Sequence, residues 1–150
     1  MNAGTTHGAK TALHLACLRG LPAMAAGLLE ARASRGLHDK DGNLPLHFAA
    51  ARAGEGCAEL CARLLETDGA DMNDLHCRNA HGDTALLVAC AAPESSASAL
   101  LLLNKGSNVL VQNMDGNTAL HLVCAYGTRA GSEHATTALV EALLAVMRIE

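Results

Sequence analysis

Aromatic residues are almost absent from this sequence of 150 residues, which has no Trp, one Tyr (Tyr126) and one Phe (Phe48). Half of the residues are nevertheless apolar, so a core has to be built from Leu, Ala, Val and Cys. Sandwiches and barrels of β-strands normally use more aromatic and β-branched residues, whereas small side chains suit closely packed helices. The composition therefore favours an all-α fold.

An excess of positive charge and long apolar runs are also missing. The net charge is −4, which argues against nucleic-acid binding, since that needs phosphate-neutralising charge and, for single strands, stacking platforms. The longest apolar stretches, such as 97–103, are far shorter than the roughly 20 residues that span a bilayer, and the N-terminus lacks the pattern of a signal peptide. We therefore expect an intracellular protein, cytoplasmic or nuclear, that binds no nucleic acid and does not insert into membranes.

A repeated motif is the strongest signal that the sequence contains. Four segments with the pattern Thr-Ala-Leu-His-Leu-Ala-Cys, or a close variant, begin at Thr11, Leu44, Thr84 and Thr118, which lie 33, 40 and 34 residues apart. Each is followed by a second apolar segment that ends in a pair of leucines. Periods of this length are typical of stacked repeat arrays, in which no single unit can bury its apolar face alone.

Two short helices are expected in each repeat. The Thr that opens three of the four motifs is a good N-cap, because its hydroxyl accepts from a backbone N–H of the first turn. Pro22 and Pro93 stand where second helices should begin, and Pro is tolerated in a first turn. Gly69 and Gly106 stand where a left-handed residue should end them.

These motifs resemble those of the ankyrin-repeat family, which combines Thr-Pro-Leu-His, Leu-Leu and Gly-Ala-Asp-Val-Asn in units of about 33 residues. Thr118–His121 and Gly69–Asn73 are close matches, and the resemblance extends from about Gly8 to Met147. It implies an all-α ankyrin solenoid of four stacked helix–turn–helix units, joined by β-turn or hairpin-like loops. The whole chain would form one domain, with units at about 9–41, 42–81, 82–115 and 116–150.

Departures from the family pattern also carry predictions. Leu44 replaces the Thr cap of the second unit, a loss of about 1 kcal/mol, and Leu87 replaces the His of the third. Extra residues around Gly54–Gly56, Asp74–Cys77 and Gly127–His134 are expected to be surface loops, which absorb insertions at little cost.

Histidine and cysteine recur together in the motif. His14/Cys17 and His121/Cys124 have the i, i+3 spacing of a thiol–imidazole nucleophile. However, the two residue types vary independently at these repeat positions, so we expect a structural role; the family resemblance implies that His14, His47 and His121 hydrogen-bond within and between repeats. We find none of the enzyme motifs we know and expect neither catalysis nor a cofactor.

The six cysteines are expected to be reduced, because disulfide frameworks belong to small chains without a core. Five Cys and His residues raise the alternative of a zinc site: Cys57, Cys61, His76, Cys77 and His81. Their spacing matches no common zinc motif. We therefore expect no metal and keep metal binding as a weaker hypothesis.

Binding of a protein partner is the function that remains. In the ankyrin family the loop tips and the exposed side of the first helices line a groove that holds partners. Carried onto this chain, the candidates are Arg35, His38, Asp39 and Lys40 at the first tip, His76, Arg78, Asn79 and His81 at the second, Gln112, Asn113 and Met114 at the third, and Arg19, Arg52 and Tyr126 on the first helices.

Two alternatives concern the end of the stack. The last helix, 139–149, is apolar on more than one side, whereas terminal repeats normally present a polar outer face. The sequence therefore also suggests a structural or regulatory ankyrin segment of a larger protein, or self-association through this helix.

Overall fold

The computed structural model describes residues 9–52, 54, 56–66, 73–92, 94–126 and 133–149. Within these ranges it contains α-helices and no strands, which confirms the all-α prediction. No helix in this part of the chain is both long and apolar enough to cross a membrane.

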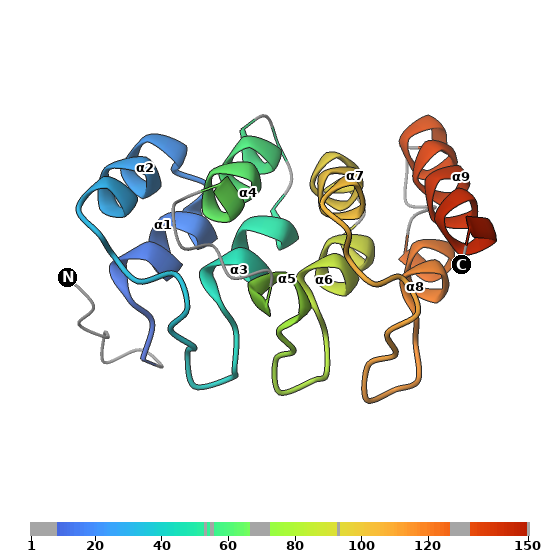
Figure 1. Ribbon diagram of the computed structural model, residues 1–150, viewed down its shortest axis with the longest axis horizontal. Coiled ribbons are helices and arrows are strands. Elements are labelled where there is room, and N and C mark those ends of the chain that lie inside the picture. Colours follow the sequence, from blue (N-terminus) through green and yellow to red (C-terminus); the bar gives the residue numbers. More distant parts are fainter. Residues whose placement is uncertain are drawn as a thin grey trace.

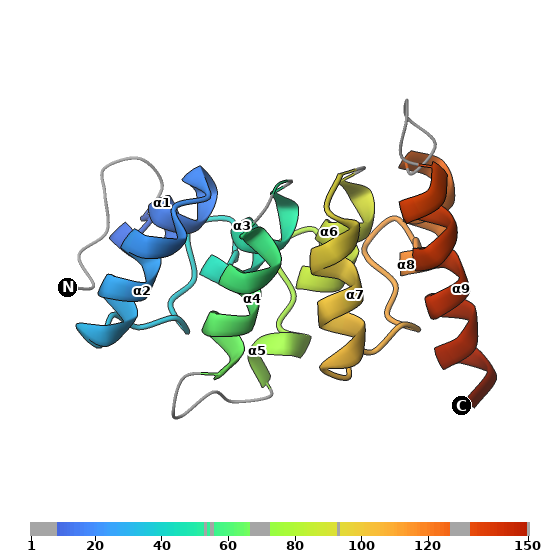
Figure 2. The ribbon, with the colours of Figure 1, turned by 90° about the horizontal axis from the view of Figure 1, so that it is seen from above.

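The helices come in pairs that stand in one row (Figure 1). The pairs are α1 (Ala12–Arg19) with α2 (Pro22–Glu30), α3 (Pro45–Ala51) with α4 (Cys57–Glu66), α6 (Ala85–Ala91) with α7 (Ser96–Asn104), and α8 (Ala119–Tyr126) with α9 (Glu133–Ile149). We call these pairs units one to four; each falls within one of the predicted unit ranges. First helices form one layer and second helices another, and the loops between units project from the same side, so the predicted stack of helix–turn–helix units is confirmed (Figures 1 and 2).

The expected Thr caps are present in units one and three. Thr11 Oγ1 accepts from the N–H of His14, and Thr84 Oγ1 accepts from the N–H of Leu87. Leu44 makes no side-chain cap, as expected, but it is only 1% exposed and lies in the core. Unit two therefore replaces a polar cap with an apolar contact.

Left-handed residues end two of the second helices. Gly106, with φ of 91°, follows α7, and its N–H and that of Ser107 bond back to the last turn, as the sequence predicted. Arg32 takes the same place after α2, with φ of 59°, and donates to the carbonyl of Leu29. The prediction for Gly69 falls outside the described residues.

Replacing Arg32 with glycine should raise the free energy of unfolding by about 0.5–1 kcal/mol, because a side chain at positive φ is strained and glycine is not. Chemical denaturation of the two proteins measures this difference. Ala31→Gly is the matched control: Ala31 has φ of −77°, so glycine there only adds unfolded-state entropy and should lower stability. Equal losses in both variants would show that Arg32 is unstrained.

Of the two second helices predicted to begin at a proline, α2 begins as expected. α2 starts at Pro22. Pro93 falls outside the described residues, and α7 starts at Ser96, after Ser95 has turned its hydroxyl back to donate to the carbonyls of Ala89 and Ala92.

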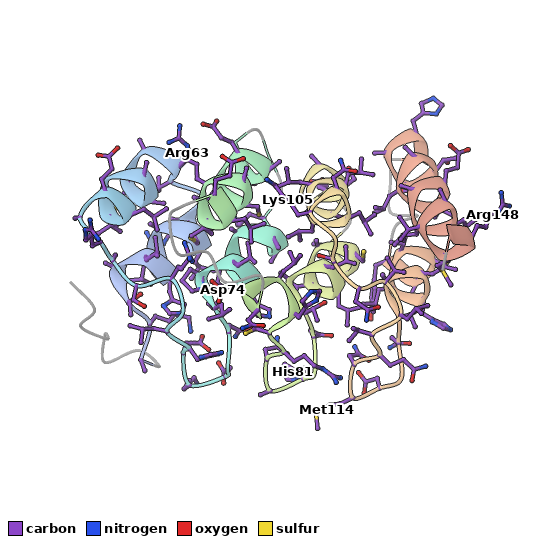
Figure 3. All side chains as sticks on the ribbon, viewed as in Figure 1. Arg63, Asp74, His81, Lys105, Met114 and Arg148 are labelled. Atoms are coloured by element: carbon purple, nitrogen blue, oxygen red, sulfur yellow. The ribbon has the colours of Figure 1, made fainter. Side chains whose placement is uncertain are left out.

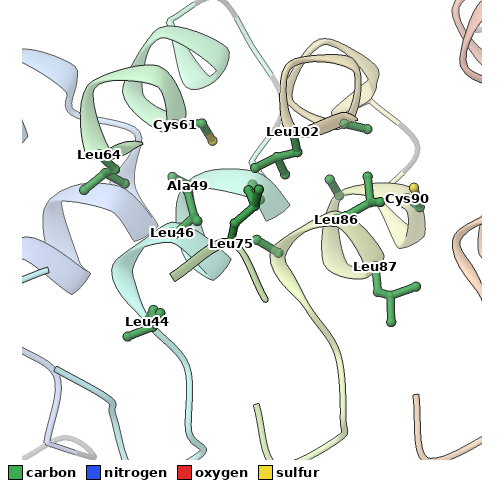
Figure 4. Close-up of a cluster of buried hydrophobic side chains, with 14 of the residues drawn as sticks. Leu44, Leu46, Ala49, Cys61, Leu64, Leu75, Leu86, Leu87, Cys90 and Leu102 are labelled. Carbon is green, nitrogen blue, oxygen red and sulfur yellow. The ribbon is translucent and has the colours of Figure 1, made fainter. Parts of the chain in front are cut away.

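One continuous core of leucine, alanine and cysteine runs between the two helix layers. Figure 4 shows its middle, where Leu46, Cys61 and Leu102 from three helices meet. Burial of such side chains is the main favourable term in folding, and in a solenoid it is shared between neighbouring units. Leu75 also lies in this cluster, 1% exposed.

The insertion at Asp74–Cys77 is therefore not the surface loop that the sequence suggested. Residues Asn73–His76 form a single helical turn, α5, which buries Leu75. An ion pair between Arg35 and Asp74, with 3.0 Å between Nε and Oδ2, holds this turn against the loop that follows α2. Of the other insertions, Gly54 is exposed, whereas Glu55 and the stretch 127–132 lie outside the described residues.

Candidate partner-binding surface

Histidines of the repeated motif join neighbouring units. His14 Nδ1 accepts from the N–H of Thr11 at 3.1 Å, so its Nε2 carries the proton and donates to the carbonyl of Asn43 at 3.0 Å. His47 does the same one unit further, between the N–H of Leu44 (3.1 Å) and the carbonyl of Asp83 (3.1 Å). These bonds confirm the role that the family resemblance implied for both residues.

Units three and four depart from this arrangement. Leu87, 2% exposed, fills the histidine position of unit three with an apolar side chain. His121 makes the bond within its own unit, to the N–H of Thr118 at 3.3 Å, but its ring is exposed. Its Nε2 meets no acceptor among the residues that the structure describes, because none of them forms a unit beyond unit four.

The three loop tips are tied to one another by their backbones. Ala80 N–H donates to the carbonyl of Asp41 at 2.9 Å, and Met114 N–H donates to that of His81 at 3.0 Å. A side chain built on Gly82, where φ is 77°, would come within 3.1 Å of the Met114 nitrogen. Neighbouring tips are therefore in direct backbone contact.

Three polar residues at equivalent places shape the tips: Asp39, Asn79 and Asn113. Asp39 Oδ1 accepts from the N–H groups of Asp41 and Asn43, and each asparagine binds its own tip in the same way. The asparagines also bridge tips, because each donates its side-chain amide to the preceding tip at 2.9 Å. Such side chains hold a turn closed from within.

Asp39 makes a buried ion pair at the first tip. Its carboxylate, 0% exposed, lies 3.1 Å from the ammonium of Lys10. Burial works against ionisation, but the N–H of Asn43 and the Lys10 ammonium outweigh it and lower the pKa of Asp39. The Asp39 carboxylate therefore binds a residue of its own chain and is not exposed to a partner.

The predicted contact residues thus divide into two groups. Five are bonded within the stack: Arg35, Asp39, Arg78, Asn79 and Asn113. Arg78, although exposed, donates to the carbonyls of Gly82 and Gln112. The other nine are exposed: Arg19, His38, Lys40, Arg52, His76, His81, Gln112, Met114 and Tyr126. We call these nine the outer contact set.

The outer contact set includes two large apolar side chains. Met114 is 78% exposed and Tyr126 is 47% exposed. In Figure 3, His81 and Met114 project from neighbouring tips on the same side of the molecule, away from Arg63 on the second-helix layer. Apolar side chains held in the open by a rigid loop are typical of protein interfaces.

Burial argues against a thiol–imidazole nucleophile at His14/Cys17. Cys17 is 0% exposed and Cys90 3%, and burial raises the pKa of each thiol to about 12. The thiolate, which is the nucleophilic form, is therefore not formed near neutral pH. Cys124 is exposed, and no hydrogen bond joins it to His121 in the part of the chain that the structure describes.

The Cys and His residues of the zinc hypothesis are not brought together. Cys61 lies in the core, where burial raises its pKa to about 12, whereas His76 and His81 are exposed. Across the described ranges, no three Cys, His, Asp or Glu side chains are placed to hold a metal ion. The six cysteines are free thiols in the structure.

The domain should lose stability as the pH falls from 7.5 to 5. Burial lowers the pKa of His14 and of His47, so the folded chain stays neutral there while the unfolded chain takes up protons below about pH 6.5. Stability is therefore complete above that pH and falls below it, by at most about 1.4 kcal/mol per pH unit for each histidine, until the folded protein titrates. Urea denaturation across this range measures the slope.

His47→Gln should make that slope shallower, since one of the two buried rings is gone. His121→Gln is the control, because it removes the same side chain from an exposed position. A slope that responds equally to both substitutions would contradict the assignment.

Comparison with known proteins agrees with this architecture. Residues 1–75, half of the chain, match the family model for ankyrin repeats (3 copies). The E3 ubiquitin-protein ligase XBAT33 of Arabidopsis thaliana is 40% identical over 85 residues, which cover 57% of this chain and 15% of that protein. The human transient receptor potential cation channel subfamily A member 1 is 37% identical over 111 residues, which cover 74% of this chain and 9% of that protein.

This chain therefore spans less than a sixth of either relative, and the likeness concerns the repeats alone. The family match agrees with three features of the structure: four helix pairs in one row, histidines that hydrogen-bond from unit to unit, and loop tips that contact one another. The chain belongs to the ankyrin-repeat family, whose repeats are generally modules for protein–protein interaction.

Proposed function

We propose that this chain is a non-catalytic scaffold that binds a protein partner through the outer contact set. One observation carries the proposal: the backbone bonds from Ala80 to Asp41 and from Met114 to His81 hold the exposed tip side chains at fixed spacing. A surface that is ordered before binding loses less conformational entropy when the partner arrives.

The chemistry of the outer contact set supports the same proposal. Tyr and Arg are over-represented among residues that dominate binding energy, and Tyr126, Arg19 and Arg52 are all exposed at the ends of first helices. Met114 adds a flexible apolar side chain that can adapt to a partner. We expect Met114 and Tyr126 to contribute most.

Support for the non-catalytic part comes from units one and three, where burial raises the pKa of the Cys17 and Cys90 thiols to about 12. The absence of disulfides favours a reducing compartment. We therefore propose an intracellular location, in the cytoplasm or the nucleus.

The test is capture from a lysate of the cells that express the protein, with three immobilised forms of the chain. Wild type and Arg63→Ala, a substitution on the second-helix layer, should retain the same proteins. Met114→Glu should lose them, with at least about tenfold weaker retention if the residue is a hot spot. Equal retention by all three forms would place the partner on another surface, and no specific retention would count against a scaffold.

A second candidate is a structural or regulatory ankyrin segment of a longer polypeptide. The observation that favours it is the size of the relatives, of which the matched region is only 15% and 9%. If the isolated chain captures a partner, that result would favour the first proposal, a scaffold that binds its partner without the rest of a longer polypeptide.

A further inference from the structure

The outer face of unit four has the composition of a face that is normally covered. In unit one, His14 and Cys17 are both 0% exposed because unit two packs over them. The equivalent residues of unit four, His121 and Cys124, are exposed, and Leu120 beside them is only half-buried. Unit four thus presents the residues of an internal contact without a neighbour in the described structure. We call Leu120, His121 and Cys124 the C-terminal face.

The opposite end of the row shows the matching feature. On α2, Met24 is 57% exposed and Leu21 is 41% exposed. Their equivalents in unit two, Leu60 and Cys57, are 0% and 6% exposed, because α4 packs against α2. Ala12 is exposed too. We call Ala12, Leu21 and Met24 the N-terminal face.

The two faces carry the donor and the acceptor of the histidine hydrogen bond that joins neighbouring units within the chain. At each described histidine contact, the histidine of one unit donates to the carbonyl of the residue directly before the first-helix N-cap of the next, Asn43 or Asp83. In unit one the residue at that position is Lys10, which precedes the N-cap Thr11. The donor at the other end of the row is His121 Nε2.

We propose that the C-terminal face of one chain binds the N-terminal face of a second copy, with His121 Nε2 donating to the Lys10 carbonyl. The contact would repeat the stacking of units one to three across two molecules. First helix on first helix would cover Leu120 and Cys124, and second helix on second helix would cover Met24 and Leu21. Because each copy uses different faces at its two ends, the association is head-to-tail and open-ended.

The distribution of exposed apolar side chains supports a copy of this chain as the occupant. Leu21 and Met24 of the N-terminal face are more than a third exposed, whereas helices α3, α4, α6 and α7 of the middle units carry no large apolar side chain exposed to that degree. The middle units bury the equivalent side chains against a neighbouring unit, and the last unit of a second copy would do the same at the N-terminal face.

The experiment measures mass by light scattering during size exclusion, in reductant, across a concentration series. The mass of the wild-type chain should rise above 15.4 kDa as concentration increases. Met24→Arg on the N-terminal face and Cys124→Arg on the C-terminal face should each remain a single chain. An equimolar mixture of the two should form a species of two chains, because each variant keeps one intact face.

One control isolates the faces. Arg63→Ala, on the second-helix layer and outside both faces, should associate as wild type does. Each arginine variant should keep the wild-type circular dichroism and urea midpoint, since both residues are exposed. A wild-type mass that stays at 15.4 kDa, association of either arginine variant alone, or a mixture that forms no two-chain species would each overturn the proposal.

Discussion

Leu75→Ala should lower the free energy of unfolding by about 2–5 kcal/mol, the usual cost of deleting a leucine side chain from a closed core. Leu75 is 1% exposed and lies in the cluster formed by helices of units two and three. The surrounding helices cannot move together to fill the cavity, because the hydrogen bonds between loop tips and the packing between units fix the distance between the helices. Chemical denaturation with a circular-dichroism readout measures the change.

Leu110→Ala is the matched control for this substitution. Leu110 also lies in a connection between units but is 53% exposed, so its removal should change stability by less than about 0.5 kcal/mol. A loss below about 1 kcal/mol at Leu75 would mean that α5 contributes little to the core.

How the sequence failed to predict α5 has a physical explanation. Periodicity needs several apolar residues in register, and Leu75 stands alone between Asp74 and His76. One apolar residue within a polar insertion is compatible with a surface loop or with a core anchor. The position was decided by tertiary packing, which the repeat pattern does not contain.

By contrast, the repeated motif predicted the helices, because it recurs four times and several copies supported each prediction. The bonds between units were implied by the resemblance to the ankyrin family, and His14 and His47 make them whereas, among the described residues, His121 does not. The Thr caps follow from local chemistry alone, which is why Thr11 and Thr84 behave as expected. Helix-capping chemistry and the fourfold repetition of the motif were together sufficient to predict the stack of helix pairs.

The orientation of the tip side chains could not be predicted from the sequence. Composition identifies Asp39, Asn79 and Asn113 as polar residues in turns, but it does not say whether their side chains face a partner or their own backbone. The regular spacing of these three residues ahead of Gly42, Gly82 and Gly116 was the available signal, because a residue needed for turn geometry recurs in every turn. A residue that contacts a partner has no reason to recur.

His47→Ala should lower the free energy of unfolding by about 2–4 kcal/mol, since it leaves a cavity and removes two hydrogen bonds from buried groups. The ring is 2% exposed, so water does not replace it. The N–H of Leu44 loses its acceptor, and the carbonyl of Asp83 loses the donor that connects units two and three. The substitution therefore weakens a contact between units as well as a helix start.

The repeat itself supplies the control for this measurement. His121→Ala removes the same side chain from an exposed position, where the bond to the Thr118 N–H at 3.3 Å is the described backbone contact of the ring. Its loss should cost less than about 1 kcal/mol, because solvent can hydrate the Thr118 N–H. Urea denaturation of the two variants at pH 7.5 gives both values, and a cost at His121 equal to that at His47 would show that the bond between units contributes nothing. The difference between the two variants thus measures what one histidine adds when a neighbouring unit covers it.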